Sequence, residues 1–372
     1  MTSQVSETPG LTLPPAPTPA WEVMESLQQA QANQNETQDG QTDDDTDDPE
    51  FDDHSDSDLD SALGSNLADS THSLNSSIFE YRTLHGRTYH SDMGTAQYWA
   101  SNDDQASESL DIAHHFTLLL LEDKLHLTPL ATNIQRVLDI GTGTDSRLCS
   151  DFADEHPNVE VVGTEISPIQ PSWIPSNLQL EIEDCNDAWT FRPSSFDFIH
   201  MRFMLGSITD WQATFKEAFT ACAPGGWVES YEVSSTMESD DDSIPDGSAM
   251  QRWGQVFEEG GQRAGRSFAI IKEDVQKSSL EAAGFVNIHV EDLKAPVGGW
   301  HPEPRLRQVG QYMQAALERD YEGYMLFLAC EMLGWTEDHV RALCAQLRRE
   351  IRSGQHHPYF RQRIVYGQKP VA

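Results

Sequence analysis

The chain has 372 residues, enough to bury one large hydrophobic core or two small ones, and its 61 acidic and 24 basic residues give a net charge of −37. So acidic a chain offers no electrostatic basis for direct nucleic-acid binding. No apolar run approaches the roughly 20 residues of a membrane span, and no basic segment followed by an apolar core indicates a secretory signal.

The first predicted segment, residues 1–76, is polar and acidic. Residues 1–81 contain neither Lys nor Arg, and the acidic residues concentrate between Asp43 and Asp60. Few apolar side chains and a high charge cannot offset the entropy lost on folding, so we predict a disordered tail. Such a tail either only solvates the protein or recruits partner proteins, and the composition favours the first.

Residues 77–372 are predicted to form one α/β domain. A long apolar helix over 111–125 comes first, and strand and helix signals then alternate. The expected strands are 136–140, 159–163, 178–182, 196–201 and 227–233, with helices at 148–155 and 211–222 and a turn at 223–226. Alternation at this spacing predicts a doubly wound, mostly parallel sheet.

The rest of the chain adds helices and the last two strands of a predicted seven-stranded sheet. We expect a loop at 234–247, helices at 250–263 and 273–283, a strand at 286–293, helical structure over 307–352 interrupted at Gly334, and a strand at 363–368. The core sheet then spans about 134–233, and a helical insertion at about 245–283 stands where this architecture usually carries a substrate lid. Residues 284–372 supply the C-terminal strands and helices.

The segment from Val137 to Thr144 is the most informative part of the sequence. An apolar strand ends in Asp139, and Gly141 and Gly143 follow in a turn that leads to a helix. Glycines in such a turn adopt positive φ and let the backbone approach a ligand that a Cβ would block.

Acidic side chains follow three successive strands. Asp139 can orient the turn or reach a ligand amine, Glu165 stands where a carboxylate binds both hydroxyls of an adenosine ribose, and Asp184 can accept from an adenine amino group. Together they predict an adenosine-containing ligand. A dinucleotide would place its pyrophosphate at the next helix N-terminus, where Asp145 would repel it. S-adenosylmethionine has no phosphate and fits better.

Longer motifs carry a resemblance to a known family. They are Gly86-Arg-Thr-Tyr-His, Asp111–Leu127, Val137-Leu-Asp-Ile-Gly-Thr-Gly-Thr, Gly163-Thr-Glu-Ile-Ser-Pro-Ile-Gln-Pro-Ser-Trp, Phe196-Asp-Phe-Ile-His-Met-Arg, Pro224-Gly-Gly-Trp-Val-Glu, Leu333-Gly-Trp and Val365-Tyr-Gly-Gln-Lys-Pro. From about Glu80 to its end, the chain resembles the LaeA-like, TAM-domain methyltransferases of filamentous fungi, which have the class I, Rossmann-like fold.

The resemblance implies S-adenosyl-L-methionine as cofactor, bound at Asp139, Gly141, Gly143, Glu165 and Asp184. It also implies methyl transfer in secondary metabolism, to a small metabolite or a protein. The family includes regulators of secondary metabolism, so the alternative is a regulatory protein with a degenerate cofactor loop that acts through protein partners.

The glycine loop departs from the family pattern at Asp145, where a third glycine is usual, and residues 145–150 form a block one residue longer. Asp145 either caps the helix that follows, or lies near the methionine carboxylate and weakens cofactor binding, or belongs to a stretch misread at an exon boundary. The first two explanations are compatible, because a self-capped helix no longer offers its N–H groups to an anion.

Candidates for the acceptor side are His200 and Arg202, which leave the fourth strand, and Tyr89 or Tyr98 on the N-terminal side. His200 is either a general base or a packed histidine, and the second is favoured. The five cysteines are widely spaced without a Cys-x-x-Cys pair, which argues for a reducing compartment and against a structural zinc site. We expect no metal and a soluble intracellular protein, nuclear or cytoplasmic.

Overall fold

The computed structural model describes residues 80–91, 98–143, 147–168 and 174–371. The predicted tail over residues 1–76 lies outside this part of the chain, and so does Asp145. No helix of the described residues is long and apolar enough to cross a membrane.

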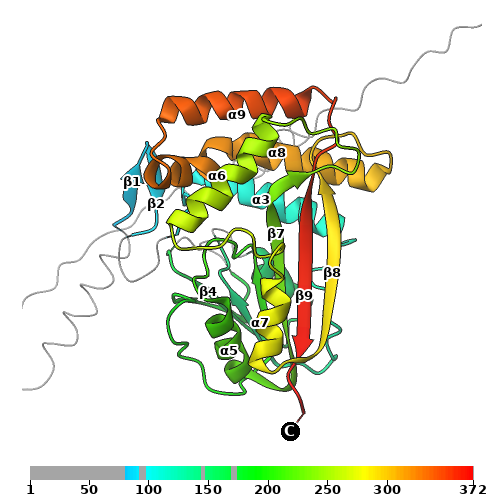
Figure 1. The fold of residues 1–372 in the computed structure, drawn as a ribbon. Helices are drawn as coiled ribbons and strands as arrows, with labels where there is room; N and C mark the ends of the chain where they lie inside the picture. Colours follow the sequence, from blue (N-terminus) through cyan, green and yellow to red (C-terminus); the bar gives the residue numbers. More distant parts are fainter. Residues whose placement is uncertain (1–79, 92–97, 144–146, 169–173, 372) are drawn as a thin grey trace, which may run out of the picture. The chain divides into compact units, whose positions relative to one another are not determined.

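The centre of the fold is a seven-stranded sheet of order β5-β4-β3-β6-β7-β9-β8 (Figure 1). The strands are β3 Arg136–Ile140, β4 Glu160–Glu165, β5 Leu178–Ile182, β6 Phe196–Arg202, β7 Cys222–Glu238, β8 Val286–Pro296 and β9 Tyr359–Gln368. The first five strands in this order, β5, β4, β3, β6 and β7, run parallel. Strand β9 lies between β7 and β8 and is antiparallel to both. This arrangement confirms the predicted doubly wound class I methyltransferase fold.

Helices cover both faces of the sheet because its central strands, such as β3 and β6, are buried on both. Successive side chains of a strand point to opposite faces, so Val137 packs in the cluster that contains Phe152, whereas Leu138 packs in the cluster that contains Phe215. The helices are α3 Asp104–Leu120, α4 Arg147–Glu155, α5 Trp211–Ala221, α6 Ala249–Arg263, α7 Val275–Ala283, α8 Pro304–Leu326 and α9 Glu337–Arg352, with a π-helix at Phe327–Met332 between the last two. Helices α6, α8 and α9 gather beyond the carboxyl end of β7 (Figure 1).

A small hairpin precedes the main sheet. Strands β1 Arg82–Leu84 and β2 Arg87–Tyr89 pair antiparallel. Their two-residue connection, His85-Gly86, has positive φ at both positions, 54° and 76°. Turns of this kind match the twist of the flanking strands, so Gly86 supports a tight hairpin.

Several predicted boundaries differ from the structure, and four of the differences are informative. Helix α3 begins at Asp104 rather than Asp111, because the side chain of Asp103 caps it by accepting from the backbone N of Ala106 at 3.1 Å. The expected turn at 223–226 and the first part of the expected loop at 234–247 both lie inside the long strand β7. Strand β9 begins at Tyr359, before the predicted 363, because it pairs with this extension of β7.

Candidate functional site

A cavity lies at the carboxyl ends of the parallel strands, the edge of an open α/β sheet where ligands bind. Its polar wall comes from the segments that follow β3, β4 and β5. Its other walls are mainly apolar and come from β7, β9 and three helices. The apolar lining includes Phe116 of α3, Trp253 and Phe257 of α6, and Met313 and Leu317 of α8.

The glycine turn forms one edge of the cavity. The backbone N atoms of Gly141 and Thr142 donate to the carbonyl of Thr164 at 2.9 and 3.0 Å, which fixes the turn beside β4. Both glycines have positive φ, but the space around them differs. A Cβ on Gly141 would meet Met204, whereas a Cβ on Gly143 would meet nothing within 4 Å. Gly143 therefore leaves open space toward the cavity that it lines.

Glu165 spans the glycine turn from the end of β4. Its carboxylate accepts from the backbone N of Gly143 at 3.0 Å, of Ile166 at 2.9 Å and of Ser167 at 3.3 Å. Burial raises the pKa of Glu165, although these three hydrogen bonds oppose the rise. The carboxylate is held on the cavity wall with acceptor capacity left, since each of its oxygens has two lone pairs.

Asp184 lines the same wall after β5. Its carboxylate accepts from the backbone N and the side-chain amide of Asn186, both at 2.9 Å. The structure thus brings Gly141, Gly143, Glu165 and Asp184 to one cavity, as the sequence predicts. Asp139 is different: it is 5% exposed and does not line the cavity.

Asp139 forms a buried pair with His200 instead. The two residues are neighbours in the register of β3 and β6, and Asp139 Oδ1 lies 2.8 Å from His200 Nδ1. Arg202, two residues along β6, contacts His114 of α3, which in turn contacts Asp151 of α4. Neither His200 nor Arg202 lines the cavity. The structure therefore does not place these two candidates at the cavity; they share one face of β6, on which Arg202 contacts α3.

The two tyrosine candidates also separate. Tyr98 lines the cavity, and burial together with the charge of Glu165 raises its pKa. The phenol is therefore protonated at neutral pH and can donate a hydrogen bond. Tyr89 is fully buried against Phe327 and does not line the cavity.

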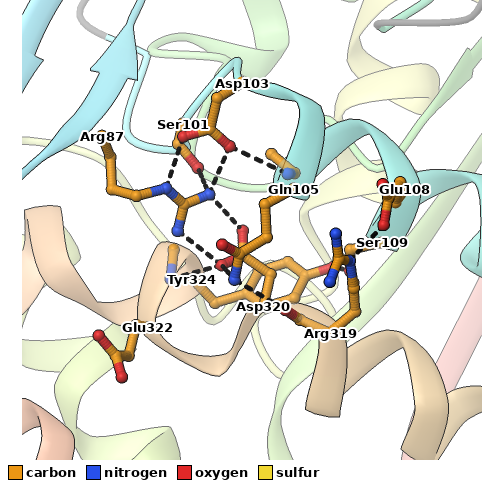
Figure 2. A network of polar contacts seen from close by, with 12 residues as sticks. Arg87, Ser101, Asp103, Gln105, Glu108, Ser109, Arg319, Asp320, Glu322 and Tyr324 are labelled. Carbon is orange, nitrogen blue, oxygen red and sulfur yellow. Dashed lines mark hydrogen bonds and ion pairs between the residues drawn. The ribbon is translucent and has the colours of Figure 1, made fainter.

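An ion-pair network lies near the start of α3 and includes cavity-lining residues (Figure 2). The guanidinium of Arg87, on β2, lies between two carboxylates: Asp103 at 2.5 and 2.6 Å, and Asp320 at 2.6 and 2.9 Å. Asp320 lines the cavity, and α8 departs from helical geometry at this residue, with φ −146° and ψ 45°. Gly323 is required here, since a Cβ would meet the Asp320 carboxylate. The network therefore joins the N-terminal hairpin to α3 and α8.

Charge is uneven in the cavity. Four carboxylates line it, those of Glu165, Glu183, Asp184 and Asp320, against one cation among the described residues, Arg266. Arg266 donates to the carbonyl of Ser207 and lies in the field of Asp184, so it belongs to the polar wall.

Four residues at or beside the cavity were not predicted from the sequence: Asp320 and its partner Arg87, and the lining amides Asn102 and Gln362. Gly86-Arg-Thr-Tyr-His gave a signal for Arg87, because a motif that serves only a hairpin turn does not need the arginine. No local pattern pointed to the others.

The comparisons agree with this architecture. Residues 109–290 match a family model described as a methyltransferase domain. The chain is similar to "Methyltransferase pytC" of Aspergillus terreus, 34% identical over 80% of this chain and 91% of that protein. It is also similar to "Secondary metabolism regulator LAE1" of Gibberella fujikuroi, 32% identical over 77% of this chain and 91% of that protein. "Probable methyltransferase tdiE" of Emericella nidulans is 31% identical over 72% of this chain and 83% of that protein.

Proposed function

The chain belongs to the LaeA-like family of fungal S-adenosylmethionine-dependent methyltransferases, and on that premise we propose that it methylates a small molecule of secondary metabolism. One observation carries the choice of acceptor. The polar wall with Glu165 and Asp184 faces an apolar chamber lined by helices α3, α6 and α8. A chamber with this lining suits a small, mostly apolar molecule better than a charged peptide segment.

The residues of the polar wall fit the cofactor. Glu165 would accept from the two ribose hydroxyls and Asp184 from the adenine amino group, and Gly143 leaves the space that the ligand needs. Asp139 would act indirectly, by holding His200 beneath the turn. When bound, S-adenosylmethionine supplies an electrophilic methyl group on a sulfonium centre.

The chain's own contribution to the reaction is to position the acceptor and exclude water. Methyl transfer depends mainly on alignment of the nucleophile with the methyl group, so a dedicated base is not required. Tyr98, protonated at neutral pH, would hold the acceptor or close the chamber by donating a hydrogen bond.

The second candidate function is regulation through protein partners, with methylation weak or lost. It is favoured by the similarity to secondary metabolism regulators and by Asp145 in the glycine loop. The two functions differ in whether the chain with Asp145 in its glycine loop binds the cofactor.

Calorimetric titration of the full chain with S-adenosylmethionine tests the proposal. We expect saturable binding with a stoichiometry of one. Absence of binding by the wild-type chain, together with binding by Asp145→Gly, would contradict the enzyme function and assign the loss to the loop. Absence of binding by both chains would contradict cofactor binding altogether.

A further inference from the structure

Two amide side chains line the cavity without a hydrogen-bond partner. Gln362, on β9, is fully buried, and Asn102, just before α3, is 9% exposed. In each, both the amide oxygen and the amide nitrogen lack a partner among the residues that the structure describes. Buried polar groups in proteins are nearly always paired, so two unpaired amides on one cavity wall indicate a missing partner.

Among the residues that the structure describes, none of those around Gln362 pairs with its amide. It lies between Val233 of β7 and Leu293 of β8 in the register of the sheet, and Phe360 stands two residues earlier on the same strand. The nearby hydroxyls of the cavity wall are engaged elsewhere. Ser234 Oγ lies 2.9 Å from the hydroxyl of Thr236, and Ser235 Oγ donates to the carbonyl of Phe268 at 3.0 Å.

A second buried glutamine shows what a structural role looks like in this fold. Gln276, on α7, is 1% exposed, and its Nε2 donates to the carbonyl and the hydroxyl of Ser230 at 3.0 and 3.1 Å. That nitrogen joins α7 to β7, whereas Oε1 of Gln276 has no partner among the described residues. Gln362 makes no such side-chain hydrogen bond to the described part of the chain, so its buried amide lowers the stability of the ligand-free protein.

The strand order separates the two halves of the cavity. Glu165 and Asp184 follow β4 and β5, whereas Gln362 lies on β9, on the other side of β3, β6 and β7. The unpaired amide is therefore remote from the residues proposed to hold the cofactor. It lines the other half of the cavity, the half that we assign to the acceptor.

We propose that Gln362 is the hydrogen-bonding determinant of acceptor binding, and that the acceptor is a neutral, mostly apolar ring compound with a donor and an acceptor side by side, as in a lactam. The inference rests on the proposed methyltransferase function. An amide satisfies both of its groups at once against such a pair. The four carboxylates of the cavity disfavour an anion, and the uncharged amide of Gln362 suits a neutral group. Asn102 supplies a second polar contact from the start of α3.

The test compares Gln362→Leu with Gln276→Leu in the full chain saturated with S-adenosylhomocysteine. Both replacements keep a similar volume and remove an amide. The probes are 2-quinolone, a neutral lactam on an apolar ring; 1-methyl-2-quinolone, which lacks the donor; and 2-naphthoate, an anion of similar size. Calorimetry gives the affinities, and thermal unfolding without ligand gives the stability.

We expect the wild-type chain to bind 2-quinolone more tightly than either other probe. Gln362→Leu should weaken 2-quinolone by about tenfold to a hundredfold, the loss of one or two hydrogen bonds, and leave S-adenosylhomocysteine binding unchanged. Without ligand, Gln362→Leu should unfold at the wild-type temperature or above it, whereas Gln276→Leu should unfold at a lower temperature.

Three results would overturn the inference: no binding of 2-quinolone by the wild-type chain, equal binding by Gln362→Leu, or tighter binding of 2-naphthoate. A fall in unfolding temperature as large as that of Gln276→Leu would also overturn it, since Gln362 would then have a structural partner. Failure of the wild-type chain to bind S-adenosylhomocysteine would instead contradict the proposed function, and the unfolding comparison would still decide the role of Gln362.

Discussion

Replacing Arg87 with Met should lower the stability of the folded domain by about 3 kcal/mol. The side chains of Arg87 and Asp320 are only 11% and 4% exposed, and loss of one partner from a buried ion pair costs roughly 3–5 kcal/mol. The lower end applies because Asp320 would keep two donors, Gln105 Nε2 and the backbone N of Gly323, both at 3.0 Å. At about 2 °C per kcal/mol for a domain of this size, the unfolding temperature should fall by about 6 °C.

Arg361→Met is the matched control. Arg361 pairs with Glu238 at 2.6 Å, but these side chains are 35% and 33% exposed, so its loss should cost no more than about 1 kcal/mol. The double variant Arg87→Met with Asp320→Asn should recover part of the stability, because no unpaired charge stays buried. Equal losses for Arg87→Met and Arg361→Met would refute the reasoning.

The pH dependence of the Arg87 variant gives an independent check. Burial raises the pKa of Asp320 even with Arg87 present, although the guanidinium opposes the rise. Without Arg87 the pKa rises further, so the folded variant binds a proton more tightly than the unfolded chain does. Its stability deficit should therefore shrink as the pH falls from 8 to 5. A deficit that stays constant over this range would contradict the assignment to Asp320.

Two further predictions concern buried glutamates. Glu165→Gln should weaken S-adenosylhomocysteine binding at least about tenfold in calorimetry, since a charge-assisted hydrogen bond is lost; unchanged affinity would remove Glu165 from the cofactor site. For Glu232, burial raises the pKa to about 8, opposed by hydrogen bonds from the backbone N of Met204 and Leu205. Because this folded-state pKa exceeds the unfolded value of 4.5, the contribution of Glu232 to stability is complete below about pH 4.5 and is lost as the pH rises through about 8. Thermal unfolding between pH 5 and 8.5 should show a steeper fall for the wild-type chain than for Glu232→Gln, and parallel curves would contradict it.

Two strands of the parallel part of the sheet were predictable to the residue. Strands β3 and β5 have the bounds that the sequence predicts, Arg136–Ile140 and Leu178–Ile182. Their ends coincide with a change in local composition. The long strand β7 was not predictable in this way, because its last residues, 234–238, are mostly polar and extend the strand by pairing with β9. The start of α3 was missed because its cap, Asp103, precedes the apolar pattern.

The polar wall of the site was predictable for a topological reason. In a parallel sheet the carboxyl ends of all strands meet at one edge, so Glu165 and Asp184 had to lie near the glycine turn. The same rule suggested His200 and Arg202, but the rule places a strand end and does not say which face a side chain takes. Arg87 and Asp320, 233 residues apart, could not be paired from the sequence at all.

The division of the cavity follows the division of the chain in part, since Phe116, Trp253 and Phe257 of the apolar walls also lie inside residues 109–290. The polar wall lies inside residues 109–290, the part similar to a general methyltransferase domain, whereas Asn102, Met313, Asp320 and Gln362 lie in the flanking segments. The flanks reach the cavity through the hairpin network at Arg87 and through β9, which inserts between β7 and β8. If the proposed roles hold, a change at Gln362 alters which acceptor binds without altering the cofactor, and a change at Glu165 does the reverse. Proteins with this domain could then keep the cofactor half while their acceptor halves diverge. The residues that select the acceptor should therefore be sought in the flanking segments rather than in the glycine turn.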